Sequence, residues 1–303
     1  MNFRVIHQTR YLYSELVSLC QNQVKLLPRD LDRQQCAGSR VVVDPPPAAF
    51  RERTDFFGNR VCYFSIQQPH RQLTVTVSSH VRISPPEAES LPDTGQPWEK
   101  ARDVLRTPSS PEIIEAGQFI LDSSLIAVTD DLKDYAQASF SPGRPLPEAV
   151  NDLMGRIHRD FEFVPGFTTV ATPLSHVLEH KRGVCQDFAQ VAIGCLRSLG
   201  LAARYVSGYI ETLPPPGKER LKGADVSHAW FSAFIPEVGW VDFDPTNNII
   251  PRDQHITTAW GRDYADVSPL KGIIFSGGTH QLTVSVDVER LPETETGTVP
   301  LNA

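Results

Sequence analysis

The segment from Gly183 to Gly200, GVCQDFAQVAIGCLRSLG, constrains the fold of this chain more than any other. Its apolar residues recur at the spacing of one helix face: Phe188, Val191, Ala192, Cys195, Leu196 and Leu199. Gly200 follows as a C-terminal cap. Cys185 stands just before this apolar stripe, so the pattern predicts a buried helix with a cysteine in its first turn.

Cys185 is thereby placed where a thiol becomes reactive. The thiolate is the nucleophilic form, and a free cysteine with a pKa of ~8.5 is mostly protonated at neutral pH. A helix N-terminus presents unpaired N–H groups and the positive end of the macrodipole, and both favour the thiolate. Cys195 lies further along the apolar face, and we interpret it as core. The five cysteines form an odd set without CxxC spacing, which is unlike a disulfide framework or a zinc ribbon.

A base and an orienting acid have to come from other parts of the chain. His228 opens the predicted strand HAWFSAFI, and Asp244 ends the predicted strand GWVDFDPT. The turn at 236–239 joins the two as a hairpin. Folding about Pro236 puts residues 228 and 244 opposite each other, whereas folding about the middle of the turn slips the pairing by roughly three residues. A bulge or a diagonal contact restores reach in the second case, so the hairpin permits a pair without fixing it.

The hydrophobic periodicity of the residues before the Cys185 segment changes along the chain. Residues 1–85 show short alternating segments broken by turn residues, which is typical of an antiparallel β-sandwich. The stretch DFFGNR at 55–60 supplies a turn between two of these strands. A proline-rich seam follows at 84–97, and helical patterns then continue to about residue 163.

Composition excludes several functional classes. The 303 residues carry a net charge of -7 without a block of lysine and arginine, so nucleic acid is not an expected partner. The N-terminus MNFRVIHQTRYLY lacks the features of a signal peptide, and no apolar run approaches a membrane span. We therefore expect a cytoplasmic protein without membrane association. The oligomeric state stays open.

Four segments together resemble those of the bacterial transglutaminase-like superfamily, some of whose members are described as cysteine proteases. The segments are RGVCQDFA, ARYVSGY, DVSHAW and GWVDFDPTNN, and residues 1–85 with DFFGNR resemble the β-rich domain that accompanies this core in bacteria. The resemblance implies an α+β fold in which a papain-like transglutaminase core follows an antiparallel β-sandwich. It places the nucleophile on Cys185, the general base on His228 and the orienting acid on Asp244 rather than Asp242. Many bacterial members carry His after CQDFA, where this chain has Gln190.

With the resemblance, four regions are predicted. These are a β-sandwich at 1–85, a linker and helical segment at 86–145, a transglutaminase-like core with a C-terminal strand at 146–291, and a disordered tail at 292–303.

The implied chemistry is acyl transfer through a thioester on a peptide or side-chain amide, with a peptide or protein as the substrate partner. We favour hydrolysis, because water is always available and no amine-binding or calcium-site motif is evident. Protein-glutamine transamidation and a non-catalytic peptide-binding module are the alternatives. An arylamine acetyltransferase is disfavoured, because its Arg-Gly-Gly-x-Cys pattern is replaced here by Arg-Gly-Val-Cys.

Further residues are candidates for lining the substrate cleft: Gln186, Asp187, Tyr209, Asp225, Trp230 and Trp240. For the two tryptophans packing is the favoured role, and for Asp187 a favourable interaction with the helix dipole. Basic residues in and before the loop at 211–226, namely Arg204, Lys218, Arg220 and Lys222, fit either an acidic-peptide contact or an ordinary solvated loop. No cofactor is implied. His176 and His180 stand four apart on a predicted helix, but no third ligand is evident, so no metal site is predicted.

Overall fold

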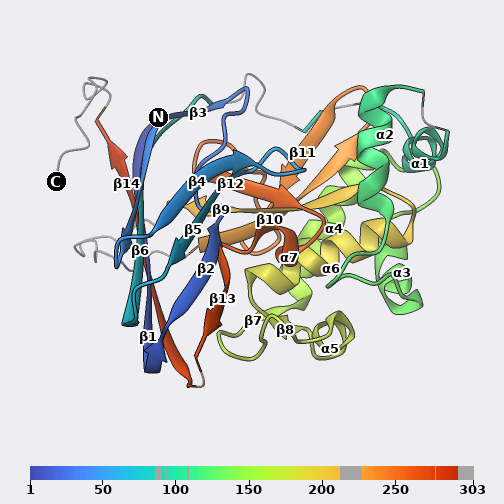
Figure 1. Ribbon diagram of the computed structural model, residues 1–303. Coiled ribbons are helices and arrows are strands. Elements are labelled where there is room, and N and C mark those ends of the chain that lie inside the picture. Colours follow the sequence, from blue (N-terminus) through green and yellow to red (C-terminus); the bar gives the residue numbers. More distant parts are fainter. Residues whose placement is uncertain (86–90, 93, 108, 212–226, 277, 293–303) are drawn as a thin grey trace, which may run out of the picture.

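The computed structural model describes residues 1–85, 91–92, 94–107, 109–211, 227–276 and 278–292. Figure 1 shows three layers: a β-sandwich, a central sheet, and a set of helices on the far side of that sheet. The predicted α+β class is confirmed. No helix in these ranges is long and apolar enough to cross a membrane.

Two four-stranded antiparallel sheets form the sandwich, with orders β14-β1-β6-β3 and β13-β2-β5-β4. The strands are β1 (Asn2–Val17), β2 (Leu19–Val24), β3 (Gln34–Asp44), β4 (Ala49–Thr54), β5 (Arg60–Ile66), β6 (His70–Ile83), β13 (Leu270–Phe275) and β14 (His280–Leu291). In β1 and β6 alternate residues point inward, as the period-2 pattern predicts. Phe3 and Val5 of one sheet and Phe64 and Ile66 of the other are buried in the same core.

The C-terminal strand belongs to the sandwich, which corrects the predicted division of the chain. β14 pairs antiparallel with β1 along nearly its whole length, from Asn2–Leu291 to Tyr13–His280. β13 likewise pairs with β2. Both C-terminal strands thus cover edges that the N-terminal strands would otherwise leave unpaired. The predicted disordered tail falls almost entirely outside the described residues.

The central sheet has the order β11-β10-β9-β12 and is antiparallel throughout. Its strands are β9 (Ala203–Ile210), β10 (Ser227–Ile235), β11 (Gly239–Phe243) and β12 (His255–Gly261). On β10, Ala229, Phe231 and Ala233 pack against the helices. The side chains between them face the sandwich, so both surfaces of this sheet are covered.

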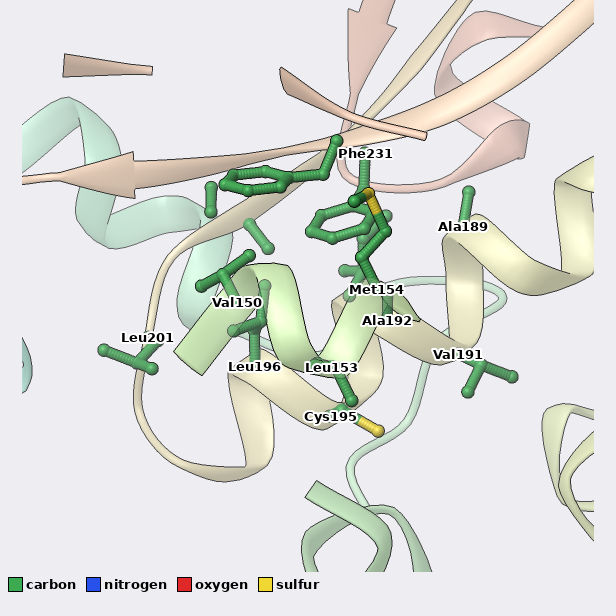
Figure 2. Close-up of a cluster of buried hydrophobic side chains, with 14 of the residues drawn as sticks. Val150, Leu153, Met154, Ala189, Val191, Ala192, Cys195, Leu196, Leu201 and Phe231 are labelled. Carbon is green, nitrogen blue, oxygen red and sulfur yellow. The ribbon is translucent and has the colours of Figure 1, made fainter. Parts of the chain in front are cut away.

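Helix α6 (Cys185–Ser198) is the centre of the helical layer. The other helices are α1 (Trp98–Arg106), α2 (Pro111–Gly117), η1 (Gln118–Ile120), α3 (Asp130–Gln137), α4 (Leu146–Asp160), α5 (Leu174–His180) and α7 (Tyr264–Val267), and two short strands, β7 (Glu162–Phe163) and β8 (Arg182–Gly183), precede α6. The predicted apolar face of α6 is buried against α4 and the sheet (Figure 2). Cys195 is fully buried, as expected of a core residue.

The helical segment at 86–145 is part of this core, although the sequence set it apart as a separate region. Trp98, Leu132 and Phe140 lie in the same hydrophobic cluster as α4 and α6. Amphipathic helices of this length cannot bury their apolar faces alone, so they dock on the nearest exposed apolar surface.

The DFFGNR turn fastens the sandwich to the central sheet. Gly58 has a φ of +76°, as a turn glycine can. The side chain of Asn59 accepts from the N–H of Trp260 at 2.9 Å and donates to its carbonyl at 2.8 Å. Asp55 accepts from the N–H of Asn59 at 2.9 Å and orders the turn itself. The predicted turn is confirmed, and it also serves as a docking element.

Candidate active site

Cys185 is the first residue of α6, as predicted, and its side chain is half-buried. Asp187 caps this helix: its carboxylate accepts from the N–H of Val184 at 2.8 Å and from the hydroxyl of Thr168 at 2.6 Å. Burial raises the pKa of Asp187, and these two hydrogen bonds offset part of the increase. Within the described part of the chain, the N–H groups of Cys185 and Gln186 have no acceptor. They are free to bind a developing oxyanion.

His228 and Asp244 form a buried hydrogen-bonded pair. His228 Nε2 lies 2.8 Å from Asp244 Oδ2, and the two side chains are 6% and 0% exposed. Phe231 pairs with Phe243 and Ile235 with Gly239, so Asp244 stands one step beyond the pairs, across from Trp230. His228 and Asp244 are thus two residues away from direct opposition, and their side chains meet diagonally across the hairpin.

The pKa values of the pair move in opposite directions. Burial lowers the pKa of His228, but hydrogen bonds with Asp244 and Cys185 and their charges outweigh it and raise the pKa to about 9. Burial raises the pKa of Asp244, yet hydrogen bonds from His228 and His255 hold it well below its usual range. His228 is therefore an imidazolium at neutral pH, flanked by a carboxylate and by the Cys185 sulfur. Since Nε2 faces Asp244, Nδ1 is the nitrogen left for the thiol.

Two residues that the sequence did not point to complete the surroundings of Asp244. His255 Nε2 lies 3.0 Å from Oδ2 of Asp244, and Asn247 Nδ2 donates to the same oxygen at 2.7 Å. The N–H of Thr246 donates to Oδ1 at 3.0 Å. His255 comes from β12, which no local pattern connects with the β10–β11 hairpin. Asn247 stands in the segment GWVDFDPTNN, where an Asp-Pro-Thr-Asn turn is the only available signal.

The cleft candidates are distributed differently from the prediction. Asp187 and Trp230 are buried, one as the helix cap and the other beneath the rings of His228 and His255. Tyr209 is also buried, and its hydroxyl meets His7 Nδ1 of the sandwich at 3.1 Å. These three do not line an open cleft, because their side chains complete the interior on either side of the sheet. Packing, the role favoured for Trp230, is what the structure shows.

The remaining candidates lie in different parts of the chain. Gln186 is half-buried beside Cys185. Trp240 lies at the other end of β11 from Asp244, where its ring packs edge-on against Phe119 and Phe234. Arg204 lies on β9, the strand before the loop, and is buried against the ring of Trp240. Asp225, Lys218, Arg220 and Lys222 lie outside the described residues.

Two clusters bring three potential metal ligands within reach of one another. The first consists of His228, Asp244 and His255. Here the Nε2 atoms of both histidines are hydrogen-bonded to Asp244. The second consists of His176, Glu179 and His180 on the exposed face of α5. His180 Nδ1 bonds the carbonyl of His176 at 3.0 Å, and the His176 ring stacks on Phe167.

Comparison with known proteins agrees with the fold. The profile described as "Bacterial transglutaminase-like N-terminal region" matches residues 3–82, and that of the "Transglutaminase-like superfamily" matches residues 133–245. An uncharacterized protein of Mycobacterium tuberculosis is 44% identical over 94% of this chain and 92% of its own length. The chain therefore belongs to the transglutaminase-like superfamily.

Two further likenesses are more distant. A solved structure from Cytophaga hutchinsonii, named a candidate cysteine protease, superposes with a TM-score of 0.73, with 20% identity and coverage of 96% of this chain and 91% of that one. It shares the fold. A protein-glutamine gamma-glutamyltransferase of Pseudomonas aeruginosa is 31% identical over 106 residues, which is 33% of this chain and 16% of that protein.

Proposed function

We propose that this protein is a cysteine-dependent acyl-transfer enzyme that hydrolyses peptide or side-chain amide bonds through a thioester. Cys185 is the nucleophile, His228 the general base and acid, and Asp244 the carboxylate that orients His228. The observation that carries the proposal is the buried His228–Asp244 bond of 2.8 Å next to a cysteine at a helix N-terminus.

Each step follows from the position of these groups. The Cys185 sulfur attacks the amide carbonyl while His228 holds the thiol proton, and the N–H groups of Cys185 and Gln186 stabilise the oxyanion. His228 then delivers the proton to the leaving amine or ammonia, which leaves a thioester on Cys185. Water, deprotonated by His228, attacks the thioester and releases the acid. Asp244 keeps its charge throughout and stabilises the imidazolium.

Transamidation is the second candidate, and it is favoured by the identity with the Pseudomonas gamma-glutamyltransferase. The two reactions share the thioester and differ only in the nucleophile that resolves it. Their separation therefore needs an acceptor experiment, and the geometry of the triad does not enter into it.

The test uses glutamine-containing peptides with and without a primary amine, analysed by mass spectrometry. We expect release of free acid that persists in the presence of the amine and is abolished in Cys185→Ala. Incorporation of the amine faster than release of acid would replace hydrolysis by transamidation. Absence of any acyl adduct on Cys185 in wild type and in the slow variant His228→Ala would argue against both and favour a binding module.

A further inference from the structure

A cavity lies between the central sheet and the sandwich, on the sheet face that Arg204, Trp240 and Asp242 share. Its volume is about 550 Å³, within the range of small-molecule sites. Both parts of the molecule line it, and the side chains that matter are Gln34, Arg204, Trp240, Asp242, His255 and Trp260. Cys185 is not among the described residues around it.

Arg204 is a buried cation in the wall of this cavity. Its side chain is 9% exposed, and its guanidinium lies between the rings of Trp240 and Trp260, at 4.3 and 3.7 Å from their centroids. The two rings cover the faces of the guanidinium, but they do not accept hydrogen bonds from the N–H groups in its plane. Nε is buried without an acceptor, and no oxygen of the described residues accepts from the other nitrogens.

Burial also lowers the pKa of Arg204 to about 9, although the charge of Asp242 acts to raise it. The side chain still carries its charge at neutral pH. A buried cation without an ionic partner is costly, and an anion in the cavity would remove that cost.

Asp242 supplies the opposite charge in the same cavity. It is half-buried, and within the described ranges its carboxylate has neither a hydrogen bond nor an ion pair, so it does not neutralise Arg204 directly. The cavity thus presents a cation and an anion that are near enough to influence each other and too far apart to pair. Asp30, Asp32 and Glu112 also border it, and so do Arg33 and Arg252, so the lining carries charges of both signs.

We propose that this cavity binds a small zwitterion, an amino acid or dipeptide, with its carboxylate on Arg204 and its ammonium group on Asp242. Such a ligand pairs with the charges of both Arg204 and Asp242, whereas a phosphate or an amine pairs with only one of them. The site is separate from the catalytic proposal and does not depend on it. His255 borders the cavity and also bonds Asp244 at 3.0 Å, so an occupant lies one hydrogen bond away from the candidate triad.

Calorimetric titration of the full-length protein at pH 7 tests the proposal, with glycylglycine as the zwitterionic probe. Acetate, methylamine and inorganic phosphate are the singly signed probes. We expect glycylglycine to bind at least about 10-fold more tightly than each of them, because it alone forms both charge-assisted contacts. Absence of glycylglycine binding, or tighter binding of phosphate, would overturn the proposal.

Variants locate the site. Asp242→Asn and Arg204→Gln should each weaken glycylglycine binding by about 10-fold or more, whereas Asp134→Asn on the exposed face of α3 should leave it unchanged. Circular dichroism and thermal unfolding verify the fold of each variant. If Arg204→Gln does not fold, the isosteric Asp242→Asn variant carries the test alone. Binding that persists in Cys185→Ala and is lost in Asp242→Asn supports this cavity, and binding that Asp242→Asn leaves intact refutes it.

Discussion

Asp244 lies diagonally across the β10–β11 hairpin from His228, and its Oδ2 is 2.8 Å from the imidazole Nε2. Two residues of slip separate these positions from direct opposition. The same oxygen is also hydrogen-bonded to His255 and Asn247, so side chains from three segments hold the carboxylate.

Replacing Asp244 tests the orienting role. Asp244→Asn keeps the shape but removes the charge that stabilises the imidazolium, so kcat should fall by roughly 10³-fold. Asp242→Asn should reduce kcat far less, because no described contact joins it to His228. Steady-state kinetics on a glutamine peptide measure both. Similar losses for the two variants would show that the assignment of Asp244 is wrong.

The raised pKa of His228 predicts a pH dependence of stability. Its pKa is about 9 in the folded chain against 6.5 for an ordinary histidine, so the folded state binds the proton more tightly. The resulting stabilisation is fully present below pH 6.5 and is lost as the pH rises through about 9. The loss is on the order of 3 kcal/mol, given about 1.4 kcal/mol for each tenfold change in proton affinity. Urea unfolding between pH 6 and 10 measures this loss. In His228→Gln the unfolding free energy should depend less steeply on pH.

Thiol labelling distinguishes Cys185 from the other cysteines. Burial raises the pKa of Cys20, raises that of Cys62 to about 11, and raises that of Cys195. We expect iodoacetamide at pH 7 to modify Cys185 at least about 10-fold faster than these three, because only an accessible thiolate reacts. Peptide mapping by mass spectrometry gives the rates, and Cys36, which is half-buried, serves as the internal reference. Equal rates at Cys36 and Cys185 would count against an activated thiol.

His255 is expected to act as a positioning residue through Asp244. His255→Phe preserves the ring but removes the 3.0 Å bond, and kcat should fall by about 10-fold. The Asp244 carboxylate then interacts with the His228 imidazole alone. The alkaline limb of the pH–rate profile, at which His228 loses its proton, should therefore move to higher pH. Mere loss of packing would lower the rate equally at every pH, and a profile of unchanged shape would contradict the positioning role.

The docking role of Asn59 is a prediction about stability. Asn59→Ala leaves the partly buried N–H and carbonyl of Trp260 without their partner, which should cost about 2–4 kcal/mol of unfolding free energy for the two groups. Phe56→Ala in the same turn is the matched control, since that ring is 81% exposed and should change stability by less than about 0.5 kcal/mol. Chemical denaturation measures both variants. A small effect of Asn59→Ala would show that the turn contributes little to docking.

Much of the local structure is predictable because it depends on neighbours in the sequence. The apolar stripe of α6, the cysteine at its first residue and the capping Gly200 with a φ of +76° all follow from residues within four positions of one another. The alternation in β1 and β6 is of the same kind. The pairing of β14 with β1 is different, since it joins segments some 280 residues apart and no local pattern specifies which open edge a late strand will cover.

The candidate site divides along the same line. The positions of Cys185 and His228, and a strand end that carries both Asp242 and Asp244, can be inferred from the sequence, because a helix start, a strand start and a strand end are local features. The choice of Asp244 over Asp242, the contact of His255, and the burial of Arg204 between two tryptophans depend on hairpin register and on packing between layers. Register shifts of one or two residues leave the hydrophobic pattern of a short strand nearly unchanged, so only the tertiary structure selects which polar side chains meet.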